Sequence, residues 1–174
     1  SIGHSFPSRK SRSQPSKPQP PTSQTQREQM NSPKDVQIVI RGRKSLSPRI
    51  KRLLKKAVQT TLEHIPISLF RKLTKNRLQG IITVAILGPK AIQSLNSKYR
   101  NKMKPTDVLS FSRIEHLSVV FPEDHELGDV LICWSIAKKQ SREYGTSLEE
   151  ELNRLTVHGV LHLDRKSTRL NSSH

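Results

Sequence analysis

The sequence predicts a single α/β domain of the mixed (α+β) kind, in which a small mixed β-sheet packs against helices. Two observations support this. Short β-branched apolar runs alternate with longer segments whose apolar residues recur every three or four positions. The two kinds of segment interleave without a clean βαβ repetition, which disfavours a regular parallel fold. A chain of 174 residues is also the size of one domain.

The first half of the domain is predicted to contain two strands and a helix. Val36–Ile40 is a β-branched run and the first expected strand. Ser47 and Pro48 are typical N-cap and first-turn residues, and residues 48–63 then carry apolar side chains at helical spacing. Gly80–Leu87 is the second expected strand. The outer side of the helix is expected to carry Lys51, Arg52, Lys55 and Lys56.

The second half adds helices around further strands. Lys90–Tyr99 has the pattern of a short helix. Strands are expected at Val108–Phe111 and Leu127–Cys133, with a weaker candidate at Leu117–Phe121.

Two consecutive helices are predicted to end the domain. The first runs from Trp134 to about Tyr144 and is stopped by Gly145. Ser147 and Glu150 then form a capping-box signature for a last helix that continues to Leu163.

The composition divides the chain into three parts. Residues 1–33 are basic and rich in Ser and Pro, and we expect them to be disordered. Residues 34–163 form the predicted domain, and residues 164–174 are a separate polar tail. Met30 precedes the first strand, so residues 1–29 are upstream sequence read in frame, a true basic extension or an organellar transit peptide.

Charge and cysteine content narrow the function classes. The net charge is +17, of which residues 35–163 contribute +10. This favours RNA or DNA as a partner ahead of a membrane, the alternative being a well-solvated surface. The only cysteine, Cys133, is expected to be a packed core thiol in a reducing compartment. No apolar run is long enough to span a bilayer, so we expect a cytoplasmic protein, or an organellar one if the transit peptide is genuine.

His158 and His162 are the candidate metal ligands. Four residues apart on a helix, they project from one face, which suits two nitrogen ligands on one ion. Incidental helix-face histidines are the alternative, although apolar neighbours favour a bound partner. Gly159 stands where a His-Glu-x-x-His protease has its general base, so protease chemistry is disfavoured.

Four ordered motifs carry a more specific resemblance. Asn96, Tyr99 and Arg100 form the first, Lys104–Phe111 the second, Gly128-Asp129 the third and His158–Leu163 the fourth. Together they resemble the YbeY family of metal-dependent endoribonucleases. The resemblance implies an α/β fold, one zinc ion (Zn2+) held by three histidines and cleavage of single-stranded RNA. It also implies a role in ribosomal RNA maturation and ribosome biogenesis, with the small ribosomal subunit as partner.

The resemblance assigns roles to individual residues. His158 and His162 would hold zinc, which makes His158 catalytic as well. Arg100 would be a catalytic and RNA-binding residue that holds the cleaved phosphate, or it forms an ion pair with Asp107 or Asp129. Substrate-binding residues that shape the cleft would be Thr106, Asp107 and Ser110. The nucleophile is water or the ribose 2′-hydroxyl. A non-catalytic RNA- or ribosome-binding factor is the alternative function.

The family pattern stops after Leu163. The third histidine is expected six positions beyond His162, where Thr168 stands, and His174 lies twelve positions beyond. Residues 164–174 instead read as the translation of a sequencing-library adapter. We therefore expect that the natural protein continues past Leu163 with the third ligand. The 174-residue chain is expected to be inactive or weakly active.

Overall fold

The computed structural model describes residues 32–42, 46–66, 68, 70, 80–112 and 126–169. Its sheet has the strand order β1-β2-β4-β3. The parallel strands are β1 (Val36–Arg41), β2 (Gly80–Leu87) and β4 (Glu126–Cys133). Strand β3 (Val108–Ser112) lies antiparallel to β4 at one edge. The predicted mixed sheet is therefore confirmed.

The helices correspond closely to the predicted segments. They are α2 (Pro48–His64), α4 (Pro89–Arg100), α5 (Trp134–Glu143) and α6 (Leu148–Arg169), preceded by a 3-10 turn at Pro33–Asp35. Of the tail predicted to be disordered, residues 1–31 lie outside the described part of the chain, as does the candidate strand Leu117–Phe121. The Asp35 backbone donates to the Ser32 oxygen and the Ser32 backbone donates to the Asp35 carboxylate, which closes a local turn before β1.

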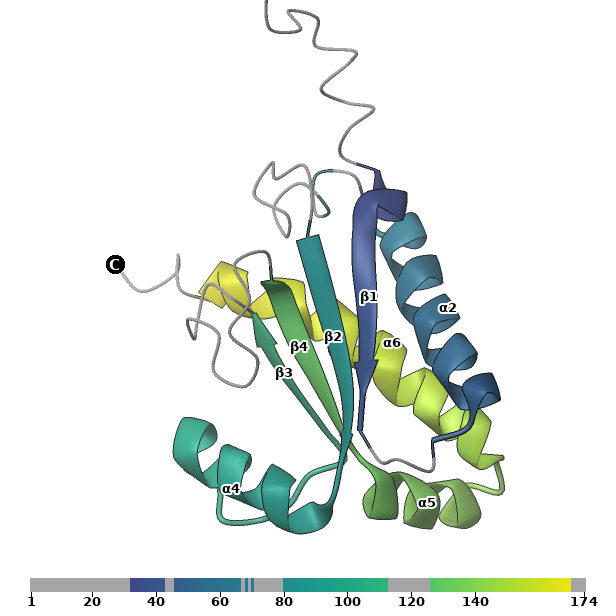
Figure 1. Ribbon diagram of the computed structural model, residues 1–174. Coiled ribbons are helices and arrows are strands. Elements are labelled where there is room, and N and C mark those ends of the chain that lie inside the picture. Colours follow the sequence, from purple (N-terminus) through teal and green to yellow (C-terminus); the bar gives the residue numbers. More distant parts are fainter. Residues whose placement is uncertain are drawn as a thin grey trace, which may run out of the picture.

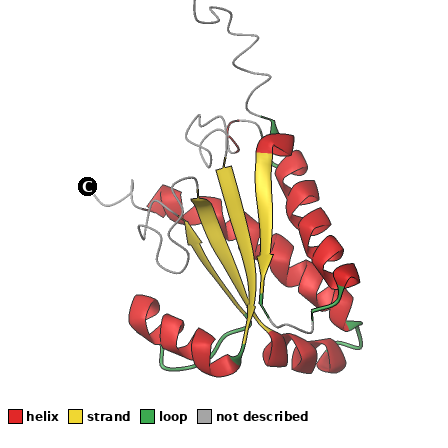
Figure 2. Ribbon diagram, viewed as in Figure 1, coloured by secondary structure: helices red, strands yellow, loops and turns green. Residues whose placement is uncertain are grey.

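The sheet has helices on both faces. Helices α2 and α6 lie side by side on one face and α4 lies on the other (Figures 1 and 2). The larger core joins α2 and α6 to side chains such as Val84 and Val130, whereas the smaller core joins Ile92 of α4 to Leu109 and Leu131. Cys133 belongs to the smaller core, which confirms a packed thiol.

Local sequence signals set the helix ends. The Ser47 side chain accepts a hydrogen bond from the Ile50 backbone at 3.2 Å, as predicted for an N-cap. Gly145 has a φ of +66° after α5, a conformation that glycine adopts without strain. The Glu150 backbone donates to Ser147 Oγ and the Ser147 backbone donates to the Glu150 carboxylate, which confirms the capping box.

Helix α6 is longer than predicted. It continues past Leu163 to Arg169. Residues 164–169 contain neither Gly nor Pro, so nothing in their sequence ends the backbone hydrogen bonding. Within the described residues, no helix is both long and apolar enough to cross a membrane.

Candidate functional site

Ser110 of β3 forms hydrogen bonds with both α4 and α6 and so connects the parts of the candidate site. The Asp107 backbone oxygen accepts a hydrogen bond from the Cys133 backbone at 2.8 Å. In an antiparallel ladder, hydrogen-bonded residue pairs alternate with pairs that are not hydrogen-bonded. Asp107 is bonded to Cys133, so Ser110, three residues further along β3, is in a pair that is not hydrogen-bonded and its carbonyl points away from β4. Arg100 Nη2, at the end of α4, donates to this carbonyl at 3.0 Å. The Ser110 hydroxyl donates in turn to the Gly159 backbone oxygen of α6 at 2.8 Å.

Gly159 is required for the close approach of α6 to the sheet. A Cβ atom there would lie 2.4 Å from Val130 Cγ1 and 3.2 Å from Ser110 Oγ. Gly128 of β4 makes the same kind of room for the next turn of α6, because a Cβ atom at Gly128 would lie 2.6 Å from Leu163 Cδ2. Close packing therefore explains why position 159 is a glycine. From the sequence alone, the same glycine served only as evidence against protease chemistry.

The two histidines lie together on the outer flank of α6. The ring centroids of His158 and His162 are 4.3 Å apart, with 62° between the ring planes. His158 is exposed and His162 is half-buried, so a ligand can reach them from solvent. Two neighbouring imidazoles fit part of a zinc site, since such nitrogens are ordinary zinc ligands.

A third ligand is not brought to this pair by the part of the chain that the structure describes. Within that part, no group of three or more His, Cys, Asp or Glu residues is arranged to hold a metal ion. Thr168 lies in the continuing helix α6, about 240° around the axis from His162. His174 lies outside the described residues.

A basic pocket lies beside β3. Its volume is about 480 Å³, and three of its lining residues are cations. The lining consists of Asn96, Arg100, Lys102, Met103, Lys104, Pro105, Thr106, Val108 and Leu109. Arg100 also lies over the Phe111 ring, at 5.8 Å from its centroid. This concentration of positive charge in a hollow suits a phosphate-bearing ligand.

The pocket loop is held to α4 by side chains whose role the sequence did not reveal. The amide of buried Asn96 donates to the Lys104 backbone oxygen at 2.6 Å, and that of Gln93 donates to the Met103 backbone oxygen at 2.8 Å. Asn101 ends α4 in the left-handed conformation, with φ +54°. The Asn-x-x-Tyr-Arg motif thus includes a residue that shapes the loop of the pocket.

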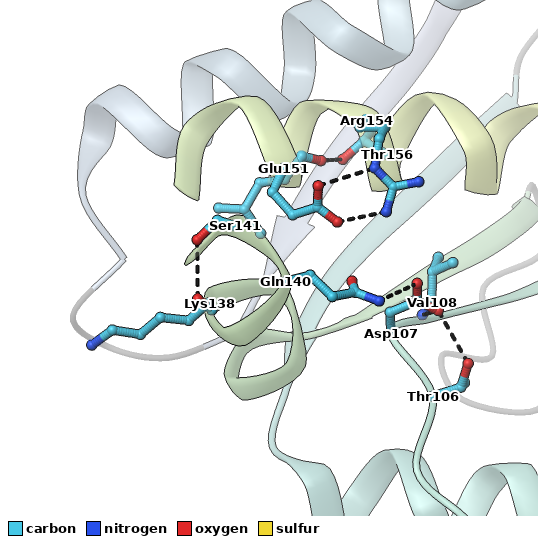
Figure 3. A network of polar contacts seen from close by, with 10 residues as sticks. Thr106, Asp107, Val108, Lys138, Gln140, Ser141, Glu151, Arg154 and Thr156 are labelled. Atoms are coloured by element: carbon cyan, nitrogen blue, oxygen red, sulfur yellow. Dashed lines mark hydrogen bonds and ion pairs between the residues drawn. The ribbon is translucent and has the colours of Figure 1, made fainter. Parts of the chain in front are cut away.

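Asp107 organises the start of β3. Its carboxylate accepts hydrogen bonds from the Val108 backbone at 2.8 Å, from Thr106 Oγ1 at 3.1 Å and from Gln140 Nε2 at 3.2 Å (Figure 3). The Arg100 guanidinium donates to the Ser110 carbonyl, and an ion pair between Arg100 and Asp107 stays a prediction. Asp129 is buried on β4, opposite Phe111 of β3 in the strand register, and its ion pair with Arg100 likewise stays a prediction.

The pair Glu151–Arg154 was not singled out from the sequence. Glu151 is 2% exposed, whereas the side chain of Arg154 is 51% exposed. The Arg154 guanidinium donates to both carboxylate oxygens of Glu151 (Figure 3), and these bonds raise its pKa above the ordinary value. Arg154 precedes His158 by one helical turn, on the same flank of α6. The only signal in the sequence is the i,i+3 spacing of opposite charges.

Comparison with known proteins identifies the family. Residues 39–164 match the family model described as Endoribonuclease YbeY. The chain belongs to the YbeY family. Proteins named Endoribonuclease YbeY from Carboxydothermus hydrogenoformans and Aquifex aeolicus are 41% identical over 105 residues and 49% identical over 82 residues. These alignments cover 60% and 47% of this chain, and 70% and 52% of the relatives.

The chain spans little more than half the length of several YbeY relatives, including 55% of one from Staphylococcus carnosus. A solution structure of a Thermotoga maritima protein aligns over 73% of this chain and 71% of its own length. It has 24% sequence identity and a TM-score of 0.45.

Three of the four YbeY motifs meet at β3. The first supplies Arg100, the second supplies Ser110 and the fourth supplies Gly159, and two hydrogen bonds join them. Gly128 of the third motif makes room for Leu163. The substrate-binding roles of Thr106, Asp107 and Ser110 stay predictions. The structure shows that Asp107 and Ser110 have their polar side chains engaged within the protein.

Proposed function

We propose that this protein is a zinc-dependent endoribonuclease that cleaves single-stranded RNA during ribosomal RNA maturation, with the small ribosomal subunit as its partner. Membership of an endoribonuclease family supports the reaction class. The observation that carries the proposal is the joint at Ser110, which fixes Arg100 and the histidine-bearing turn of α6 to one strand. As part of the same proposal, the reaction takes place in the cytoplasm.

His158 and His162 are the residues that would hold the metal ion. A bound zinc ion would supply a water of lowered pKa and would polarise a phosphate oxygen. The chain's own contribution is to hold both imidazoles on one solvent-facing flank. The missing side chain of Gly159 lets α6 lie close to the sheet, and the hydrogen bond from Ser110 to the Gly159 backbone oxygen ties α6 to β3.

Arg100 would bind and orient the phosphate. Its guanidinium is held by the Ser110 carbonyl and by the Phe111 ring, so little side-chain freedom is lost when an anion binds. Planar N–H donors match two phosphate oxygens and stabilise charge that grows on them. Lys102 and Lys104 line the same pocket and would attract the neighbouring backbone of the RNA.

The test combines cleavage with ribosomal RNA processing in cells. The natural full-length protein with zinc should cleave single-stranded RNA, spare duplex RNA and stop when a chelator is added. Cells that carry His158→Ala should accumulate ribosomal RNA with unprocessed ends. Cells that carry His64→Ala, a change at the exposed end of α2, should process it normally.

One result would favour the non-catalytic alternative, which the basic charge of the domain supports. This is steeply salt-dependent RNA binding that survives loss of both histidines, with no cleavage and with normal ribosomal RNA ends in the His158→Ala cells.

A further inference from the structure

Helix α2 presents a strip of positive charge to solvent. Lys51, Arg52, Lys55 and Lys56 are all exposed, while the opposite side of the helix is buried against β1 and α6. Among the described residues, none of these four cations has an acidic partner. Arg49 does have one, because its guanidinium pairs with Glu149 of α6 at 2.9 Å. We call Lys51, Arg52, Lys55 and Lys56 the α2 strip.

The positive charges of the α2 strip lower the stability of helix α2. Lys51 and Lys55, like Arg52 and Lys56, are four residues apart, where like charges repel on a helix surface. The cations also occupy the N-terminal half of α2, where the helix dipole is positive, and its first turn contains no acidic residue. Local rules that a sequence breaks in this way are expected at functional sites.

The α2 strip is separate from the pocket at Arg100. Helix α2 packs against β1, whereas Arg100 bonds to β3, and these strands are the two opposite edges of the described sheet. Figure 1 shows α2 beside β1 and away from β3. An anion bound to the α2 strip would therefore not occupy the pocket at Arg100.

The composition of this surface favours a phosphate backbone over a protein. The exposed side chains of α2 after Pro48 are polar or charged, and only Lys56 of the α2 strip lines the more apolar groove between α2 and α6. Protein interfaces need apolar or aromatic anchors at their centre, and helices that bind membranes need an apolar face. A nucleic-acid backbone needs only regularly placed cations. Residues four apart on a helix rise by about 6 Å, which is comparable with one nucleotide step.

We propose that the α2 strip is a second RNA-binding surface, which holds phosphates of the RNA that flanks the segment in the cleft. The choice of RNA rests on the proposed function. A short RNA would fill the cleft alone, whereas a long RNA would reach both surfaces. The strip would therefore contribute to affinity for long RNA and not to cleavage of short RNA.

The test compares two variants of equal charge change. The first is Arg52→Gln, Lys55→Gln and Lys56→Gln on α2. The matched control replaces two lysines and one arginine that are exposed on α5, by Lys138→Gln, Lys139→Gln and Arg142→Gln. Binding to a long RNA and to an RNA of about 8 nucleotides is measured by fluorescence anisotropy, in chelator so that no cleavage occurs, over a range of salt.

The α2 variant should bind long RNA about tenfold more weakly, and the slope of log affinity against log salt should fall by about 2 for three lost phosphate contacts. Its binding to the short RNA should be unchanged, and its melting temperature should be equal or higher because repulsion is relieved. The α5 control should change long-RNA affinity less than twofold.

Equal affinity of the two variants for long RNA would overturn the proposal. So would unchanged RNA binding together with a selective loss of binding to anionic lipid vesicles. Cleavage of the short RNA by the natural full-length protein is measured separately. A lack of cleavage would count against the endonuclease and not against the α2 strip.

Discussion

The hydroxyl of Ser110 donates a 2.8 Å hydrogen bond to the backbone oxygen of Gly159, 49 positions further along the chain. The carbonyl oxygen of the same serine accepts a hydrogen bond from the guanidinium of Arg100. One residue of an edge strand therefore connects the basic pocket to the helix that carries the two histidines.

Gly159→Ala should destabilise the fold. The new methyl group would meet Val130 Cγ1 at 2.4 Å, and both the helix backbone and the sheet would have to shift. Overpacking of this kind costs about 1–3 kcal/mol. Urea denaturation followed by circular dichroism measures the free energy of unfolding.

Ser110→Ala is the comparison for that change. It removes one hydrogen bond without adding volume, and it should cost about 1 kcal/mol. Gly159→Ala should therefore be the more harmful of the two. An alanine at position 159 that is neutral would mean that α6 lies further from the sheet than described.

Loss of either histidine should weaken metal binding. We expect the 174-residue chain to bind zinc weakly, because its described part supplies two imidazoles and no third ligand near them. His158→Ala and His162→Ala should each reduce the affinity further, by at least about tenfold. Competition with a chromophoric chelator measures this, with His64→Ala as the unaffected control. Tight one-to-one zinc binding by the unmutated chain would contradict the expected absence of a third ligand.

Arg100→Lys should impair RNA cleavage although the charge is kept. A lysine cannot present two parallel N–H donors to a phosphate or keep the planar contact with Phe111. The loss of such a donor at the reacting phosphate typically costs about 100-fold in rate. Single-turnover cleavage of a short RNA by the natural full-length protein and its variants measures the effect. Arg142→Lys on the exposed surface of α5 should have no effect, and equal activity of the two variants would remove Arg100 from the mechanism.

The start of α6 should show a pH-dependent contribution to stability. The Ser147 backbone N–H holds the pKa of the Glu150 carboxyl below its ordinary value of 4.5. A lowered pKa in the folded state means that the carboxylate stabilises the fold above the unfolded pKa. This stabilisation is lost as the pH falls through the folded value. Thermal unfolding of wild type and Glu150→Gln should therefore differ at pH 7 and converge as the pH falls below the lowered pKa of Glu150.

Ser147→Ala removes the other half of the same capping box. It should cost about 1 kcal/mol at neutral pH, which is typical for loss of an N-cap side chain. A difference between wild type and Glu150→Gln that stays constant from pH 3 to 7 would show that the carboxylate charge is not what stabilises the cap.

Local patterns were enough to predict most of the elements. Gly80–Leu87 was predicted with the bounds that the structure shows, because a β-branched run that meets Gly88-Pro89 cannot continue as a strand. The end of α6 was predicted less well. A polar sequence does not stop a helix when it lacks Gly and Pro, so α6 runs on to Arg169.

The sequence predicted which motifs belong to the site but not how they are arranged in space. The spacing of His158 and His162 already implied that they share a helix face, since that depends only on helical geometry. The network of Asp107, Gln140, Glu151 and Arg154 could not be anticipated. Its members come from three segments whose contacts depend on how α5 and α6 pack against the sheet.

The sequence alone determined the strands, the helix starts, the family and the identity of the candidate ligands, because each of these is encoded by neighbouring residues. The tertiary structure decided the strand order β1-β2-β4-β3 and the role of Ser110 as the joint between Arg100 and Gly159. It also separated the α2 strip from the pocket. These features arise from contacts between residues far apart in the chain, which form only when α2, α4 and α6 bury their apolar faces on the two sides of one sheet.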